Sequence, residues 1–325
     1  MLNHRGFLRS FRHFPFLPCW LDEHGYPGLA FQPAMLHWGR AVGAALGAAT
    51  AKCLLRSQQN VYMSAATFAS LLLRRGDIFA DVGAYDGLIS LVAAHAVGDS
   101  GQIYSFEPNP AAFARLRCIT RAYGLSHIHI ENCAVSAQEG MATLYVPNSA
   151  TEATLSNKSL ASGAVAHPCR VRTLDAFWAE QPGASSPTLI KIDVEGAELD
   201  VLAGAQRMLA CSLPPMVIFE ASDANAASFG RTIDDVLNFL TTFGYRFWML
   251  QYPNIVSITR SADINPTRSP QFWTDVLALN PKVHKAQFQK LCQRFPQMTS
   301  NVDPLGQIKS DKGSSTSGND ALIPL

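Results

Sequence analysis

Two short segments of the chain each place an acidic residue at the end of an apolar stretch typical of a buried strand. In residues Phe79–Gly87 this acid is Asp81, and in Leu189–Glu198 it is Asp193. Both segments continue into a helical pattern, and a doubly wound α/β sheet binds ligands in the crevice where such strands end. The two carboxylates would line that crevice with negative charge, which favours a cationic ligand.

The glycine loop after the first strand differs from a dinucleotide-binding loop. A dinucleotide site requires Gly-x-Gly-x-x-Gly, in which the middle glycine lets the backbone approach a pyrophosphate. Here Gly83 and Gly87 are present, but Tyr85 occupies the place of the middle glycine. Asp81 and Asp86 would also repel a diphosphate. The loop therefore disfavours NAD and FAD and suits a ligand that carries an ammonium and a sulfonium.

Glu107 follows the next predicted strand, 20 residues after Gly87. An acid in this place hydrogen-bonds the vicinal hydroxyls of a ribose. A glycine loop combined with a ribose-binding acid, without a phosphate cradle, predicts S-adenosylmethionine as the cofactor. A structural alternative stays open, in which the glycines make a tight turn and Glu107 caps a helix.

The second segment supplies the candidate catalytic carboxylates, Asp193 and Glu195. At a strand end, Asp193 would face the amino-acid part of the cofactor, the acceptor hydroxyl or a metal. Glu195 has either a substrate role or a favourable interaction with the helix dipole. Lys191 shares a face with Asp193. We predict a buried ion pair of Lys191 with Asp193, Asp81 or Glu220, and the alternative is a lysine base with a lowered pKa.

Two other chemistries were weighed against these residues. Asp193, Asp223 and Asn225 would offer hard oxygen ligands to Mg²⁺, but the last two lie in an Ala/Ser-rich loop, and no metal site is predicted. Enzymes that methylate nucleobase amino groups carry an Asp/Asn-Pro-Pro-aromatic segment after the fourth strand to stack a flipped base. Here that place reads Asp193-Val194-Glu195-Gly196, so nucleobase methylation is disfavoured.

The composition of the whole chain excludes several classes of protein. The 325 residues carry 26 Lys and Arg against 25 Asp and Glu, which argues against binding a nucleic acid along its phosphates. The seven cysteines form no Cys-x-x-Cys pair, which favours a reducing cytoplasmic setting over zinc or disulfides. No transmembrane segment is predicted, because a span needs ~20 mostly apolar residues. Arg5, Arg9 and Arg12 among apolar neighbours allow membrane-surface contact or packing on the domain.

The order of elements predicts an α/β fold with a doubly wound, mostly parallel sheet. We expect an N-terminal, partly helical extension over 1–75, a main domain over 76–260, a helical addition over 261–298 and a disordered tail over 299–325. The predicted strands are 77–82, 102–106, 127–133, 142–146, 165–171, 188–192, 216–219 and 245–250, and the predicted helices are 64–73, 88–96, 111–123, 198–209 and 234–243.

Several motifs occur in the order seen in FkbM-type methyltransferases, and the chain resembles that family over about residues 77–222, more weakly to about 250. The resemblance implies a class I methyltransferase domain with a Rossmann-like, seven-stranded sheet that uses S-adenosylmethionine. The motifs are Asp81-Val82-Gly83-Ala84, Phe106-Glu107-Pro108-Asn109-Pro110, Asn132-Cys133-Ala134-Val135, Ile190–Glu198 and Val201-Leu202-Ala203-Gly204-Ala205.

The resemblance also assigns roles to individual residues. It implies that Glu107 binds the ribose and that Ala134 lies near the adenine. It implies a cofactor loop formed by Asp81, Gly83, Ala84 and Gly87.

Methyl transfer to a hydroxyl of a sugar, polyketide or other small metabolite is the implied activity, so the expected partner is a small hydroxylated acceptor. Asp193 and Glu195 would orient that acceptor or take up its proton, and Asp193 also faces the cofactor. The alternative is a catalytically inactive S-adenosylmethionine-binding module with an assembly or regulatory role. The residue types do not indicate an oligomeric state.

Overall fold

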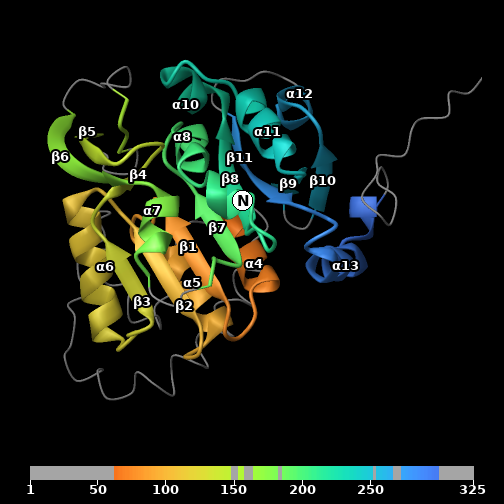
Figure 1. The fold of residues 1–325 in the computed structure, drawn as a ribbon, viewed down its shortest axis with the longest axis horizontal. Helices are drawn as coiled ribbons and strands as arrows, with labels where there is room; N and C mark the ends of the chain where they lie inside the picture. The colour runs from red at the N-terminus through yellow and green to blue at the C-terminus, as the bar shows by residue number, and fades with distance from the viewer. Residues whose placement is uncertain are drawn as a thin grey trace, which may run out of the picture.

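The computed structural model describes residues 62–147, 153–156, 164–181, 185–251, 254–265 and 272–299. Its centre is an eight-stranded sheet with the strand order β10-β9-β11-β8-β7-β1-β2-β3 (Figure 1). The strands of this sheet are β1 (Ile78–Val82), β2 (Gln102–Phe106), β3 (Ile128–Glu131), β7 (Leu189–Ile192), β8 (Met216–Ser222), β9 (Arg246–Gln251), β10 (Asn254–Ile258) and β11 (Trp273–Leu279).

The pairing confirms the predicted doubly wound, mostly parallel sheet. The strands β3, β2, β1, β7 and β8 are parallel to one another in that order. Strand β11 is antiparallel to both of its neighbours, β8 and β9. The strands from β3 to β9 make up the seven-stranded sheet that the resemblance implies, although β11 was not among the predicted strands. Strand β10 adds an eighth at the edge as the antiparallel partner of β9.

Helices cover both faces of the sheet, and the strands alternate their side chains between two apolar cores. On β1, Phe79 packs with one core and Ala80 with the other, as the twofold period of a strand requires. The first core includes residues of α4 (Tyr62–Leu72), α5 (Leu88–Val97) and α13 (Lys285–Arg294). The second includes residues of α7 (Leu174–Ala179), α8 (Glu198–Ala203), α9 (Gln206–Leu209) and α11 (Ile233–Thr242).

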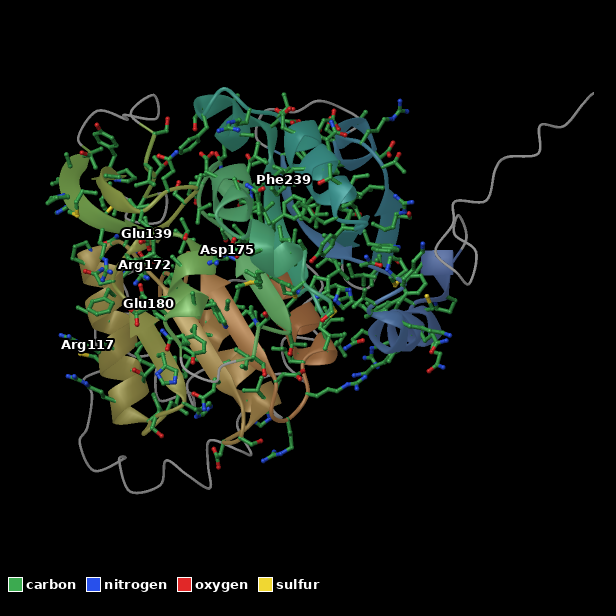
Figure 2. All side chains as sticks on the ribbon, viewed as in Figure 1. Arg117, Glu139, Arg172, Asp175, Glu180 and Phe239 are labelled. Carbon is green, nitrogen blue, oxygen red and sulfur yellow. The ribbon has the colours of Figure 1, made fainter. Side chains whose placement is uncertain are left out.

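A second, three-stranded sheet lies beside the main one. It has the order β4-β6-β5 and consists of β4 (Ala134–Val135), β5 (Gly140–Val146) and β6 (Val165–Arg172). Arg172 of β6 ties this sheet to its surroundings, since its guanidinium lies 2.7 Å from both Glu139 and Glu180 (Figure 2). The remaining elements are α6 (Pro110–Ala122), α10 (Asp223–Ser228), α12 (Ser261–Ile264) and the 3₁₀ helix η3 (Pro296–Thr299).

The helix expected over 198–209 is wrong as a single element, because it divides into α8 and α9. A side chain at Gly204 would overlap the carbonyl oxygen of Ser136, so the chain turns where it packs closely. The carboxylate of Asp175 then accepts from Arg207 N at 2.8 Å and Met208 N at 3.0 Å. Asp175 thereby satisfies backbone donors at the start of α9, which allows a new helix to begin.

The segment 261–298 was expected to be a helical addition, and that expectation needs correction. It contains β11, which lies inside the main sheet between β8 and β9. Six of its seven residues are buried, so the strand lacks the alternation that would have indicated it. The helices α12 and α13 flank this strand. Of the extension 1–75, only the part from α4 onward is described, and residues 1–61 and 300–325 lie outside the described residues.

No helix in the described ranges has the length and apolar character needed to cross a membrane.

Candidate active site

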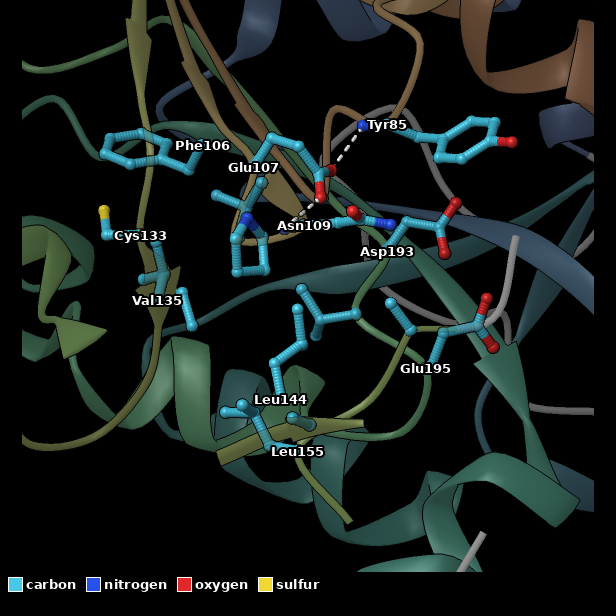
Figure 3. A pocket seen from close by; sticks show the side chains of 17 residues that line it. Tyr85, Phe106, Glu107, Asn109, Cys133, Val135, Leu144, Leu155, Asp193 and Glu195 are labelled. Atoms are coloured by element: carbon cyan, nitrogen blue, oxygen red, sulfur yellow. Dashed lines mark hydrogen bonds between the residues drawn. The ribbon is translucent and has the colours of Figure 1, made fainter. Parts of the chain in front are cut away.

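A cavity lies where β1, β2 and β7 end and the small sheet begins (Figure 3). Its empty volume is about 820 Å³, including the part open to solvent. Five of the predicted site residues line it together: Gly83, Glu107, Ala134, Asp193 and Glu195. Segments 110 residues apart in the sequence, around Gly83 and Asp193, thus meet at one place.

Three predicted cofactor residues, Asp81, Ala84 and Gly87, do not line the cavity and instead support its wall. Asp81 is only 1% exposed, and its Oδ2 accepts from Ser90 Oγ at 2.6 Å. Burial raises the pKa of Asp81, whereas the nearby charge of Lys191 lowers it. Ala84 N donates to the carbonyl of Phe106 at 3.1 Å, and Gly87 precedes α5 in a left-handed conformation with φ 82°.

Gly83 brings two loops into direct contact. It has φ +81°, and a Cβ built there would overlap the carbonyl oxygen of Asp193. Asp193 N in turn donates to the carbonyl of Val82 at 3.0 Å. Only glycine adopts this conformation readily and leaves room for the neighbouring backbone. The glycine predicted from the loop motif is therefore required to place Asp193 at the cavity.

Glu107 is held in a fixed orientation at the cavity wall. Its Oε2 accepts from Tyr85 N and its Oε1 from Asn109 N, each at 2.7 Å. Burial raises the pKa of Glu107 to about 7, and these two hydrogen bonds act in the opposite direction. Because a carboxylate has about four lone-pair positions, both oxygens keep acceptor capacity for a ligand.

Lys191 and Asp193 form the predicted ion pair, with Nζ 2.5 Å from Oδ2. Lys191 is 3% exposed. Burial alone would lower the pKa of Lys191, but the carboxylates of Asp193, Asp81 and Asp275 together raise it above its usual value. The ammonium therefore stays charged at neutral pH, and the alternative of a lysine base with a lowered pKa is wrong. Asp275, on β11, was not predicted to take part.

A group of carboxylates lies next to this pair. Oxygens of Asp193, Glu195 and Glu220 lie within 4.8 Å of one another. The side-chain amide of Asn225 donates to Glu195 Oε2 at 2.7 Å and to Glu220 Oε2 at 3.2 Å. Burial, followed by the charges of Asp193 and Glu195, raises the pKa of Glu220 to about 10.

The carboxylate group differs from the possible magnesium ligands in the sequence, which are Asp193, Asp223 and Asn225. Asp223 begins α10 and is not a member of the group, whose third acid is Glu220 of β8. Asn225 contacts the group through its amide nitrogen. Glu195 and Glu220 were both named from the sequence, Glu220 as a possible partner of Lys191. The register of β7 and β8 brings Glu220 beside the loop that holds Asp193 and Glu195.

Backbone strain marks two residues of the cavity. Tyr85 (φ 46°) and Glu195 (φ 56°) are the non-glycine residues with positive φ in the described part of the chain, and both line the cavity. Such conformations persist where the surroundings enforce them, and they cluster at functional sites. In the sequence, only its place in the glycine loop distinguishes Tyr85. In the structure, the Arg115 guanidinium carbon lies 5.5 Å from the centroid of the Tyr85 ring.

Residues 153–156 close one side of the cavity. Thr154 pairs with Tyr145 of β5 through two backbone hydrogen bonds of 2.8 and 3.0 Å, and Ser156 Oγ donates to the carbonyl of Ser228 at 3.0 Å. Leu155 contributes both to this cavity and to a second, more open pocket next to it. The second pocket is lined by Ala142, Thr143, Tyr145, Leu155, Ser156, Ser228 and Phe229.

Charge is distributed unevenly over the two pockets. The charged side chains that line the first cavity are Glu107, Asp193 and Glu195, all acidic, and no charged side chain lines the second pocket. Such a surface attracts cations and repels phosphates and carboxylates. The adjoining pockets can hold a cationic ligand beside a neutral one.

Comparison with known proteins identifies relatives of this chain. A curated "Methyltransferase 1" from Beauveria bassiana (strain ARSEF 2860) is 27% identical over 141 residues, which are 38% of this chain and 56% of that protein. The match therefore spans little more than half the length of the relative.

Matches among solved structures were also found. A methyltransferase FkbM from Methylobacillus flagellatus KT has a TM-score of 0.40 and 16% identity, covering 81% of this chain and 69% of that one. A SAM-dependent O-methyltransferase from Thermotoga maritima has a TM-score of 0.36 and 12% identity, covering 69% of this chain and 66% of that one.

The family is established by a family model rather than by these individual likenesses. The model of the methyltransferase FkbM domain matches residues 81–247, just over half of the chain. The matched range begins at Asp81 and includes every residue of the predicted site. It ends within β9, so β10 and β11 lie beyond it. The chain thus belongs to the methyltransferase FkbM domain family.

Proposed function

We propose that this protein uses S-adenosylmethionine to methylate a hydroxyl of a sugar, polyketide or other small metabolite. The observation that carries the proposal is the cavity at the ends of β1, β2 and β7, which joins the fixed Glu107 carboxylate to Asp193 and Glu195. This arrangement offers acceptors for a ribose on one side and negative charge for a sulfonium and an ammonium on the other.

The residues present fit this cofactor better than they fit a dinucleotide. All charged side chains that line the cavity are acidic, which suits a sulfonium and opposes a diphosphate. Glu107 would bind the ribose, Ala134 would lie near the adenine, and Gly83 and Asp193 would face the methionine part. When bound, the cofactor supplies a methyl group activated by its positively charged sulfur.

Asp193 and Glu195 are the carboxylates proposed to act on the acceptor. Lys191 already occupies Oδ2 of Asp193, which fixes that side chain and suits it to orienting a hydroxyl. Glu195 shares a neutral amide, Asn225, with Glu220, which suits Glu195 to taking up the acceptor proton. Positioning of this kind lowers a barrier by up to ~7–11 kcal/mol.

The second pocket is proposed to hold the acceptor. It adjoins the cofactor cavity at Leu155 and combines hydroxyl groups with the rings of Tyr145 and Phe229. Its lining has no charged side chain, which suits a neutral small molecule and provides nothing to bind the phosphates of a nucleic acid. The acceptor is therefore proposed to be a small hydroxylated compound.

Calorimetric titration with S-adenosylmethionine and S-adenosylhomocysteine tests the cofactor. Wild-type protein should bind both with micromolar affinity, and Glu107→Ala should weaken binding at least tenfold, which is about 1.4 kcal/mol. Glu131→Ala is the matched control, because Glu131 ends the neighbouring strand β3 and does not line the cavity. Its affinity should stay within threefold of wild type.

Two other outcomes would change the conclusion. Folded wild-type protein that binds neither compound contradicts the proposed cofactor. Binding without methyl transfer to any hydroxylated acceptor in a broad screen supports the inactive, cofactor-binding module instead.

A further inference from the structure

Asn109 has a buried donor without a partner at the wall of the cofactor cavity. The residue is 3% exposed and lines the cavity, and no hydrogen bond satisfies its Nδ2. Asp81, His127 and Trp248 also have such an atom in the described part of the chain, and none of the three lines this cavity. A buried donor left unpaired is costly, and each case needs a physical reason.

The local fold does not need this amide nitrogen. Asn109 is the N-cap of α6, and its Oδ1 accepts from Ala111 N at 3.0 Å while Pro110 occupies the first helical position. Serine or aspartate would cap the helix equally well, because capping uses only a side-chain oxygen. Helix capping thus accounts for the oxygen of the carboxamide and leaves the NH₂ group unexplained.

The neighbouring Glu107 indicates which ligand group the Asn109 amide would bind. Glu107 Oε1 accepts from the backbone N of Asn109 at 2.7 Å, and both residues line the cavity wall (Figure 3). An ionised carboxylate only accepts hydrogen bonds and an amide NH₂ only donates them, whereas a hydroxyl does both. Together, Glu107 and Asn109 are complementary to a pair of vicinal hydroxyls.

We propose that Asn109 is a further cofactor-binding residue, whose Nδ2 donates to a ribose hydroxyl oxygen while Glu107 accepts from the ribose hydroxyls. This inference rests on the proposed use of S-adenosylmethionine. It makes recognition of the ribose depend on two side chains with opposite hydrogen-bonding character. The bound ribose would supply the acceptor that the buried amide lacks.

The test measures binding of S-adenosylhomocysteine and of its 2′-deoxy and 3′-deoxy analogues by calorimetry. The main variant is Asn109→Ser, which keeps a capping oxygen but is too short to reach the ribose. Asn109→Asp is a second variant that keeps both the size and the cap. Asn132→Ser is the matched control, because the amide of Asn132 already donates to the carbonyl of Glu107 at 2.8 Å and does not line the cavity.

Asn109→Ser and Asn109→Asp should lower the affinity for S-adenosylhomocysteine at least tenfold, whereas the affinity of Asn132→Ser should stay within threefold of that of wild type. At least one deoxy analogue should bind wild type tenfold more weakly than S-adenosylhomocysteine. The same analogue should bind Asn109→Ser and wild type within threefold of each other, because groups that interact directly have non-additive effects. Thermal unfolding of each variant confirms that it is folded.

Other outcomes overturn the inference in distinguishable ways. Wild-type affinity in folded Asn109→Ser shows that the amide does not bind the cofactor. An equal loss of affinity for all three ligands shows that the amide contacts a part of the ligand other than the ribose. Failure of wild-type protein to bind S-adenosylhomocysteine overturns the proposed function itself, and the inference with it.

Discussion

Lys191 is a buried cation that balances several carboxylates at the centre of the sheet. Its ammonium pairs with Asp193 and also interacts with Asp81 and Asp275. Lys191→Met should lower the free energy of unfolding by about 3–5 kcal/mol at pH 8, because it leaves buried carboxylates without their partner. The loss should be smaller at pH 5, where Asp275, whose pKa burial raises to about 7, is protonated.

Urea unfolding at both pH values measures this difference. Arg207→Met is the control, because Arg207 is 71% exposed and lies 3.7 Å from Asp175, and exposed pairs contribute under about 1 kcal/mol. Equal losses for the two variants would show that Lys191 does not have the proposed structural role.

Substitution of Glu195 tests catalysis separately from cofactor binding. Glu195→Gln keeps the size of the side chain but removes its capacity to take up a proton. With the acceptor found by screening, kcat should fall by roughly 10²- to 10⁴-fold, while the Kd for S-adenosylhomocysteine, which carries no sulfonium, changes less than threefold. Single-turnover transfer of a labelled methyl group measures the chemical step. A kcat within threefold of wild type would remove Glu195 from the proposed chemistry.

At the same scale, the sequence located residues whose position follows from a strand end and missed those that depend on contacts between loops. Glu107, Asp193 and Glu195 follow apolar strands closely enough to be found from pattern alone. Asn109 lay inside a recognised motif, but its unpartnered nitrogen is a property of the folded cavity. Glu220 was named from the sequence as a possible partner of Lys191, but its place beside Glu195 depends on the packing of β8 beside β7.

At the scale of the elements, the conformation of the loop after β1 depends on Gly83. Gly83→Ala would bring a Cβ into the carbonyl of Asp193 at positive φ. We expect it to lower the free energy of unfolding by more than about 3 kcal/mol, since the backbone must move as well as adopt a strained conformation. Gly124→Ala is the control, because Gly124 also has positive φ (+63°) but no atom lies within 4 Å of its Cβ position.

The control should cost only about 1–2 kcal/mol, which is the strain of a left-handed residue with a side chain. Chemical denaturation compares the two variants directly. Similar losses would mean that the contact between the β1 and β7 loops is easily displaced, and the close approach at Gly83 would then not be needed to place Asp193.

Elements were predicted well where periodicity and length agreed. The strand 102–106 has the predicted bounds, α5 differs from the prediction by one residue at its C-terminal end, and α6 differs by one residue at each end. The predictions failed where tertiary contacts decided. Strand β11 is buried on both faces, β4 has two residues, and the break between α8 and α9 depends on Ser136 and Asp175, which are distant in sequence.

Over the whole molecule, buried acids make stability depend on pH. Burial raises the pKa of Glu107, Glu198 and Asp275 to about 7 each. Between pH 4.5 and 7 the folded state therefore holds protons that the unfolded state has released, so the ligand-free protein should lose stability as pH rises. The slope is up to about 1.4 kcal/mol per pH unit for each such group. Urea unfolding at pH 5, 6, 7 and 8 measures it, and stability that rises across this range contradicts the expectation.

The same acids should make the two cofactor forms respond differently to pH. S-adenosylmethionine carries a sulfonium that S-adenosylhomocysteine lacks, so their affinities differ by the attraction between that charge and the carboxylates. As pH rises from 6 to 9, Glu107 ionises first, and Glu220, whose pKa burial and the nearby acids raise to about 10, begins to follow. S-adenosylmethionine should therefore gain roughly tenfold in affinity over S-adenosylhomocysteine across this range.

Glu220→Gln should abolish the part of this gain that occurs above pH 8. Calorimetry at each pH measures the affinity of wild type and variant for both compounds. A ratio that stays constant with pH would mean that the sulfonium lies away from the acidic wall, which would move the proposed methyl-transfer position from Asp193 and Glu195.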